Sequence, residues 1–359
     1  MGAPTVIIVT HFPSPYQVEL FNEVERQRPG LLRVLYLNRR VAARKWAGVQ
    51  ATHDHGYVDD GSTAIEAALK DVVAAPLVVF NYYNDAVAAG LIEARAESGK
   101  RWCFWGERPG YRFPTLARVA RMIRLAPLRT GVQPIWGMGR WAVSAYRAEF
   151  GDTHPYLNLP YYSNLDSFRS VQPRYSPEPT FLFSGSLIHR KGVDLLARAF
   201  LSAIETHPRI RLKLMGEGPL QKRLQHELAS SGRVEWVGFT DWGALAPVYA
   251  TAQILCVPSR HDGWGLVVPE GLASGLPTIS TDHTGAALDL IKPRHNGWIV
   301  RAGDADALTR AMKQAASLTA EEWGAMSRRA RCSIAEHSLA NGASRLLGGV
   351  DEALASKVH

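Results

Sequence analysis

Residues 180–204 read TFLFSGSLIHRKGVDLLARAFLSAI, and this stretch decides the fold. A short apolar run at its start predicts a buried strand, a polar loop follows, and a helical pattern begins at Gly192. The same order of strand, loop and helix recurs at 5–27 and at 210–231. This alternation is typical of a parallel sheet covered by helices on both faces.

The alternation runs through the chain in two series. Further apolar runs that predict strands lie at 32–37, 77–82, 101–106, 234–239, 254–259 and 276–281. Between the series, the stretch 167–180 carries three prolines and no apolar period, which indicates a linker. We therefore predict an α/β protein of two doubly wound, Rossmann-like domains facing a cleft. Their expected bounds are 1–168, a linker at 169–180, and 181–339, with a C-terminal helix at about 340–359 packing back on the first domain.

The composition narrows the class of protein. Hydrophobic residues make up 46% and charged residues 21%, as in a folded globular chain. The net charge of +8 favours anionic partners such as nucleic acid, an anionic membrane surface or phosphorylated small molecules. The three cysteines are far apart and predict neither a disulfide framework nor a zinc site. We expect a cytoplasmic protein without signal peptide or membrane span, at most peripheral at the inner face of the membrane.

A pair of carboxylates follows the predicted strand 254–259. The stretch 259–271, SRHDGWGLVVPEG, places Asp262 and Glu270 eight residues apart. Ligands of open α/β folds bind where strands end at the carboxyl edge of the sheet. Either carboxylate can accept hydroxyl hydrogen bonds from a ribose or a sugar. The alternative is a capped surface turn whose two acids face solvent.

The residues between these carboxylates suit a close approach to a ligand. Gly263 and Gly265 allow a sharp turn. Pro269 is tolerated only in a first helical turn, so it predicts a helix that begins near Leu266 or Val267. The free amides at such a helix start favour phosphate.

Two other strand ends carry suitable residues. Arg190 and Lys191 are adjacent cations in a strand-to-helix loop, which suits a diphosphate, although an exposed basic turn is the alternative. The turn 216–218, Gly-Glu-Gly, follows a strand and precedes Pro219. This turn alone is weak evidence, but together the segments place three strand ends on one edge.

These segments, in this order, resemble the retaining GT-B glycosyltransferases of family 4. The resemblance covers residues 180–300 closely and the N-terminal half more loosely, through PSPYQVELFNEV, FWGERPG and YLNLPYYSN. It differs from the family pattern in Asp262, where a Glu is usual, and in Ser186, where an Arg is frequent. The motifs that carry it are the cation pair at 190–191, the G-x-G-P turn at 216–219, the acid-x7-acid pattern at 262–270, the A-x-G-x-P segment at 273–277, and the loops 285–289 and 296–300.

The resemblance implies the transfer of a hexose from a UDP- or GDP-sugar, with retention of configuration and without a metal or other cofactor. It implies that Lys191 and Arg190 neutralise the diphosphate, that Glu270 holds the ribose, and that Asp262 contacts the transferred sugar. The implied donor-binding set is Arg190, Lys191, Gly216, Gly263, Trp264, Gly265, Leu266, Val267 and Glu270.

Strand ends of the N-terminal half offer further polar side chains to the cleft. His11, Asn81 and Arg108 are candidates for the acceptor side, and His11 has an alternative as an ordinary loop histidine. Glu107 lies where relatives often carry a polar residue that faces the sugar. We therefore place Glu107 with Asp262 and Lys191 in the expected catalytic set.

The segment 112–149 is strongly basic. It holds one acid, Glu149, and seven arginines, at positions 112, 118, 121, 124, 129, 140 and 147. Its first part predicts a basic amphipathic helix with Leu116, Val119, Ala120 and Ile123 on one face, which suits an anionic membrane surface. Trp136 and Trp141 favour a lipid interface. The alternative is a solvated helix that packs on its own domain.

The expected function is a glycosyltransferase of polysaccharide or glycoconjugate synthesis that acts on a saccharide or lipid-linked acceptor. A nucleic-acid-binding protein is not indicated, because no recognisable module or patch interleaved with stacking aromatics is present. A non-catalytic nucleotide-sugar-binding relative and a nucleotide-sugar epimerase of the same fold remain alternatives.

Overall fold

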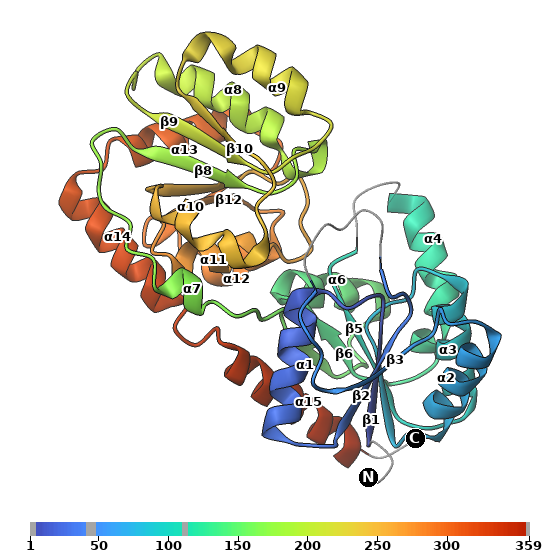
Figure 1. Ribbon diagram of the computed structural model, residues 1–359. Helices are drawn as coiled ribbons and strands as arrows, with labels where there is room; N and C mark the ends of the chain where they lie inside the picture. Colours follow the sequence, from blue (N-terminus) through green and yellow to red (C-terminus); the bar gives the residue numbers. More distant parts are fainter. Residues whose placement is uncertain (1–4, 41–47, 110–113, 357–359) are drawn as a thin grey trace. The chain divides into compact units, whose positions relative to one another are not determined.

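The computed structural model describes residues 5–40, 48–109 and 114–356 (Figure 1). The chain divides into two compact units. The N-terminal unit combines the residues up to Asn164 with those from Ser338 onward, and the C-terminal unit spans Leu165–His337. Each unit is built on its own parallel sheet.

The sheet of the N-terminal unit has, within the described residues, the strand order β3-β2-β1-β4-β5-β6-β7, with all pairs parallel. Its strands are β1 (Val6–Thr10), β2 (Leu32–Tyr36), β3 (Asp54–Tyr57), β4 (Leu77–Phe80), β5 (Trp102–Gly106), β6 (Ile135–Gly137) and β7 (Tyr156–Asn158). Its helices are α1 (Pro15–Gln27), α2 (Ser62–Ala74), α3 (Ala86–Glu97), α4 (Pro114–Arg124), α5 (Ala126–Arg129), α6 (Arg140–Phe150) and α15 (Leu339–Ala355).

Helices cover both faces of this sheet, so its central strands β1 and β4 are buried throughout. Figure 1 shows α1 and α15 against one face and α2 and α3 against the other. Arg28, just after α1, forms a bidentate ion pair with Asp351 of α15, and Gln27 donates to the carbonyl of Ala340. The C-terminal helix therefore packs on the N-terminal unit.

The sheet of the C-terminal unit has the strand order β10-β9-β8-β11-β12-β13, again all parallel. Its strands are β8 (Thr180–Ser184), β9 (Arg211–Met215), β10 (Val234–Val237), β11 (Ile254–Val257), β12 (Thr278–Thr281) and β13 (Gly297–Val300). The helical segments are α7 (Asp166–Arg169), η1 (His189–Lys191), α8 (Val193–Ile204), α9 (Gln221–Leu228), η2 (Ala229–Ser231), η3 (Trp242–Ala244), α10 (Ala246–Ala250), α11 (Val267–Ala273), α12 (Gly285–Leu290), α13 (Ala305–Ala316) and α14 (Ala320–Ser333).

The stretch 180–204 forms the centre of this unit. Phe181 and Phe183 of β8 are buried with Leu196 and Phe200 of α8 in one apolar core. In Figure 1, α8 and α9 lie over one face of the sheet and α10, α11 and α12 over the other. The predicted pair of Rossmann-like α/β domains is thus confirmed.

The segment 169–180 differs from the linker that its prolines predict. It lies along the C-terminal unit, where Arg331 of α14 donates to the carbonyls of Arg169 and Val171. Gln253 donates to the carbonyl of Arg174 and accepts from the amide of Thr180. Proline keeps a chain extended but does not prevent its carbonyls from being bound by side chains.

The strand order reverses direction at one point in each sheet. In the C-terminal unit the chain moves outward from β8 through β9 to β10, and then restarts on the other side with β11. Such a switch point leaves a crevice at the carboxyl ends of the two central strands, where ligands of open α/β sheets bind. Here these ends are Ser184 and Val257. No helix among those described is long and apolar enough to cross a membrane.

Candidate active site

An ion pair stands at this switch point. Lys191, the last residue of η1, places its Nζ 2.6 Å from Oδ2 of Asp262. Arg190 places Nη1 3.8 Å from the other carboxylate oxygen and donates to the carbonyl of His261 at 2.9 Å. The structure thus brings together two expected phosphate cations and the expected sugar-facing acid.

The charge balance of this cluster favours the ionised carboxylate. Burial alone would raise the pKa of Asp262, but the charges of Lys191 and Arg190 outweigh it, and the net pKa lies below its usual value. Asp262 is therefore a carboxylate at neutral pH, held by two cations.

Two glycines with positive φ bring the loops into contact. Gly192 ends η1 in the left-handed region at φ 70°, and a side chain there would collide with the carbonyl oxygen of Pro258. Gly265 has φ 90°, and a side chain there would press against Thr284 and the carboxylate of Asp262. The backbone can follow this path only with glycine at these positions.

A second ion pair, which the sequence did not reveal, fixes the cation loop. Arg260 forms two hydrogen bonds of 2.6 and 2.7 Å with the carboxylate of Asp194, in the first turn of α8. Arg260 also donates through Nη1 to the carbonyl of His189 and through its amide to that of Arg190. This side chain therefore fastens η1 to the loop that carries Asp262.

The helix α11 begins at Val267 after Leu266, as the position of Pro269 predicts. Glu270 lies in its first turn and is buried. Its Oε2 accepts a 2.7 Å hydrogen bond from the hydroxyl of Tyr249. Burial raises the pKa of Glu270 to about 7, although Tyr249 and Lys191 each act to lower it. Glu270 is thus divided between its neutral and charged forms near neutral pH.

The Gly216 turn joins the same edge. Gly216 has φ 124°, and a side chain there would collide with the carbonyl of Gly185 at the end of β8. Its amide donates to the carbonyl of Val237, and the amide of Leu187 donates to the carbonyl of Glu217. The loops after β8 and β9 therefore lie against each other.

The side chain of Trp264 has a structural role. Its ring is buried and stacks on His337 with a centroid distance of 6.0 Å. Its Nε1 has no hydrogen-bond partner in the described part of the chain. Gly263 beside it is buried, while Leu266 and Val267 are half-buried. Of this group, we retain the backbone rather than the Trp264 side chain as the expected ligand contact.

In the N-terminal unit, His11 and Asn81 follow β1 and β4 at the carboxyl edge. The ring of His11 stacks on Tyr82 at 4.2 Å, nearly parallel. The Asn81 carbonyl oxygen accepts from Thr10 and Gln17, and its amide donates to the carbonyl of Trp105. This side chain ties three strand ends together, so its geometry is that of a structural bridge.

Glu107 and Arg108 follow β5 at the same edge of that sheet. Glu107 is exposed, and its carboxylate is hydrogen-bonded to the buried Tyr161, whose pKa burial raises. Arg108 stacks over the ring of Trp141 at 3.8 Å. Burial and the nearby Arg121 lower the pKa of Arg108.

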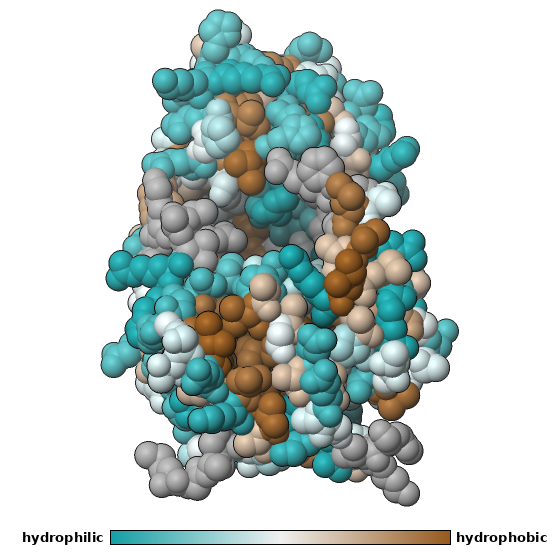
Figure 2. Space-filling model, turned by 90° about the vertical axis from the view of Figure 1, so that its right-hand side faces the viewer, coloured by the Kyte–Doolittle hydropathy of each residue, from teal (hydrophilic) through white to brown (hydrophobic). Residues whose placement is uncertain are grey.

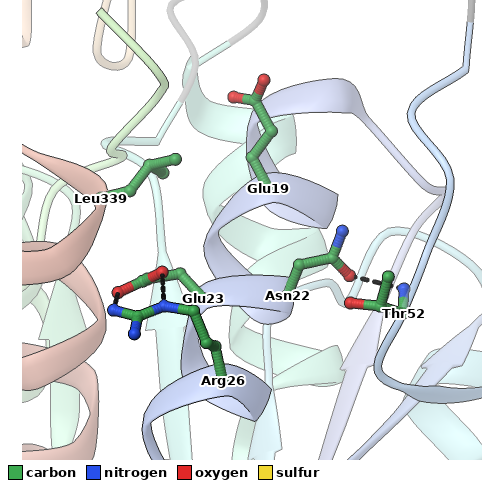
Figure 3. A pocket seen from close by; sticks show the side chains of 6 residues that line it. All are labelled: Glu19, Asn22, Glu23, Arg26, Thr52 and Leu339. Carbon is green, nitrogen blue, oxygen red and sulfur yellow. Dashed lines mark hydrogen bonds and ion pairs between the residues drawn. The ribbon is translucent and has the colours of Figure 1, made fainter. Parts of the chain in front are cut away.

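A hollow of about 370 Å³ lies beside α1 in the N-terminal unit (Figure 3). Its charged side chains already have partners, because Arg26 binds Glu23 at 2.6 Å and Glu19 accepts from the amide of Asn164. No pattern in the sequence predicted this hollow. Its lining residues are Glu19, Asn22, Glu23, Arg26, Thr52 and Leu339. In the described ranges, no cluster of three or more His, Cys, Asp or Glu could hold a metal ion.

The basic helix α4 buries a charged side chain and exposes apolar ones, which is the reverse of the usual arrangement. Arg121 points inward and forms a largely buried ion pair with Glu149, while Leu116 and Ile123 are 70% and 71% exposed. Val119 and Met122 are exposed as well. Figure 2 shows apolar side chains gathered at the surface on the face that carries α2, α3 and α4.

The other members of the basic segment occupy varied places. Trp136 is buried in β6, so the expectation that it marks a lipid interface is wrong. Its strand pairs on both sides and leaves the ring inside the domain. Trp141 is half-buried beneath Arg108. Arg112 lies outside the described residues.

Comparison with known proteins finds similar sequences and similar folds. Residues 166–332, slightly less than half of the chain, match the family model "Glycosyl transferases group 1". In solved structures, the fold resembles HepE from Anabaena in complex with UDP and glucose, with a TM-score of 0.74, 12% identity, and coverage of 97% of this chain and 99% of that one. It also resembles sucrose-phosphate synthase from Thermosynechococcus elongatus, with a TM-score of 0.76, 17% identity, and coverage of 99% and 100%. The fold is that of GT-B glycosyltransferases.

Curated relatives match over shorter stretches. The lipopolysaccharide core biosynthesis glycosyltransferase LpsE of Rhizobium meliloti is 31% identical over 38% of this chain and 39% of its own length. A GDP-mannose-dependent α-(1-6)-phosphatidylinositol monomannoside mannosyltransferase of Mycolicibacterium smegmatis is 26% identical over 58% of each chain. The matches thus span less than two thirds of these relatives.

Proposed function

We propose that this protein is a retaining glycosyltransferase that moves a hexose from a nucleotide-sugar donor to a hydroxyl of a saccharide or lipid-linked acceptor. One observation carries the proposal: Lys191 and Arg190 hold Asp262 at the switch point of a sheet in the segment that matches the glycosyl transferases group 1 family. Glu270 follows on the next helix.

The charges of these residues suit the departure of a nucleoside diphosphate. As the bond between the anomeric carbon and the phosphate oxygen breaks, the electron pair stays on the diphosphate. Lys191 and Arg190 stabilise that negative charge. The acceptor hydroxyl attacks from the same face and passes its proton to the leaving phosphate oxygen. These steps require no protein nucleophile, metal or cofactor.

Donor binding then exchanges one partner of Lys191 for another. In the structure, the ammonium of Lys191 is paired with Asp262. When the diphosphate arrives, Lys191 turns to it, and the Asp262 carboxylate becomes available to the hydroxyls of the transferred sugar. Glu270 holds the ribose.

The α4 surface favours an acceptor at an anionic membrane, at the cytoplasmic face. Its exposed side chains Leu116, Val119 and Ile123 can enter the boundary of the headgroups, while Arg118 is exposed beside them. Basic side chains gain about 1 kcal/mol each near an anionic leaflet. The names of the two curated relatives, one for lipopolysaccharide core and one for phosphatidylinositol monomannoside, agree with a membrane-bound acceptor.

The experiment is a screen of UDP- and GDP-sugars for the release of nucleoside diphosphate, with and without membrane lipid extracts. Slow release of free sugar with its nucleoside diphosphate supports a transferase, and proton NMR of the first-formed anomer tests retention. An isomerised donor would instead identify an epimerase. Binding of donor without any turnover, with or without the extracts, would indicate a non-catalytic relative.

A further inference from the structure

A hydroxyl lies behind Glu270 that the proposed reaction does not use. Tyr249, on α10, is buried and donates its phenolic proton to Oε2 of Glu270 at 2.7 Å. The side chain of Ser184, at the carboxyl end of β8, is hydrogen-bonded to the same phenol. Since the phenol has one proton, which goes to Glu270, Ser184 is the donor to the phenolic oxygen.

The ring of Tyr249 is fixed in this orientation. Phe168 of α7 meets it edge to face, with a centroid distance of 5.1 Å and an angle of 75°. The helix α7 also packs on α10 and on α11, which carries Glu270. Three elements therefore fix the distance between the phenol and the carboxylate.

We propose that Tyr249 is a positioning residue for the donor: it holds Oε2 of Glu270 and turns Oε1 toward the ribose hydroxyls. This inference rests on the proposed function for the identity of the ligand. Its basis is the short hydrogen bond between two buried groups and the packing that keeps the ring in place. Ser184 completes the chain, so the carboxyl end of β8 is joined to α11 through one phenol.

Few other charges act on Glu270. Lys191 of η1 faces it, and Tyr249 faces it from α10. Arg331 of α14 contacts α11 at the opposite end, at the carbonyls of Ala273 and Ser274. Tyr249 and Lys191 both favour the charged carboxylate. Removal of the phenolic hydroxyl should therefore raise the pKa of Glu270.

The test is Tyr249→Phe, which keeps the ring and removes only the hydroxyl. We expect the donor KM at pH 7 to rise about tenfold with a smaller change in kcat, because a hydrogen bond to a charged group is lost. The pH below which donor affinity declines should move upward. Ser184→Ala should shift both quantities in the same direction by less.

Tyr36→Phe is the matched control. Tyr36 is also buried, and its hydroxyl is hydrogen-bonded to His53 in the N-terminal unit at 3.0 Å. The same atom is removed from a comparable site, so a general loss of packing would affect both variants. We expect Tyr36→Phe to leave the donor KM and its pH profile unchanged.

A second measurement separates this inference from the proposed function. Carbon-13 NMR of glutamate-labelled, ligand-free protein follows the titration of Glu270, identified through Glu270→Gln. A higher midpoint in Tyr249→Phe supports the contact with or without a known donor, and an unchanged midpoint overturns the inference. A raised midpoint with an unchanged pH profile of the donor KM would overturn the positioning role. If the wild-type protein binds no nucleotide sugar, the proposed function fails and the titration alone decides the contact.

Discussion

Lys191 and Asp262 form a hydrogen-bonded ion pair of 2.6 Å between side chains that are 19% and 12% exposed. At this depth water screens the charges weakly, so loss of either side chain would leave the other charge buried and uncompensated. The pair joins η1 to the loop that precedes α11. It therefore links the stability of the C-terminal unit to the residues on which its proposed chemistry depends.

Lys191→Ala should lower the free energy of unfolding by roughly 3 kcal/mol, because it leaves the Asp262 carboxylate buried without its main partner. Donor binding or turnover should fall tenfold or more. Glu270→Ala should have a kinetic effect of similar size through loss of the ribose contact. Urea unfolding and the release of nucleoside diphosphate measure the two effects.

An exposed pair provides the control for this prediction. Arg28 and Asp351 are 42% and 53% exposed, and Arg28→Ala should cost less than about 1 kcal/mol. Unchanged kinetics in both Lys191→Ala and Glu270→Ala would refute the proposed site.

Glu270→Gln should stabilise the protein at high pH. The pKa of Glu270 is raised to about 7 in the folded protein, so the stability it contributes is present below its unfolded pKa and is lost as pH rises through 7. A neutral amide avoids that loss, which by linkage is of the order of 3 kcal/mol at pH 8 and above. Thermal unfolding should show a higher Tm than wild type at pH 8.5. The difference should disappear near pH 4.5, and a constant difference across this range would contradict the prediction.

Gly192→Ala should destabilise far more than Gly232→Ala. Both glycines have positive φ, 70° and 58°, so both variants bear the strain of a left-handed residue, about 1 kcal/mol. At Gly192 the added carbon also meets the carbonyl oxygen of Pro258, whereas nothing lies within 4 Å of it at Gly232. We expect a loss on the order of 3 kcal/mol for Gly192→Ala. Equal denaturant midpoints for the two variants would exclude the close approach of these loops.

Leu116→Ser with Ile123→Ser should abolish binding to vesicles that contain anionic lipid, if α4 inserts its apolar face. Ile65→Ser with Leu69→Ser is the control, because these two side chains are each 39% exposed but belong to α2 and not to α4. Co-sedimentation at low and moderate salt measures the effect. Absence of wild-type binding to such vesicles would remove the membrane from the proposal.

Much of the fold could be predicted from the sequence because its central strands are buried on both faces. Runs such as β1 and β11 are buried throughout and almost wholly apolar, so they stand out from the helices. The edge strand β3, with the sequence DHGY, has no buried residue and gave no such signal. The strands β6 and β7 each have three residues, which is too short for a period to appear.

Some residues of the candidate site could likewise be predicted from the sequence, and others could not. Asp262, Lys191 and Glu270 could be found because glycines and strand ends mark their loops. Arg260 could not, since its partner Asp194 lies 66 positions away and only the fold brings the two together. Tyr249 left one signal, a phenol within a short apolar helix, which requires a polar partner once it is buried.

Arg331 binds four carbonyl oxygens, those of Ala273 and Ser274 at the end of α11 and those of Arg169 and Val171 in the segment before β8. One guanidinium thereby ties the end of the helix that carries Glu270 to the chain that enters the C-terminal unit. A protease that needs an extended, unbound backbone would find a poor substrate there, although the three prolines suggest an open connection. Limited digestion should therefore leave 169–180 attached to the C-terminal unit, and any nicking of the chain should begin elsewhere.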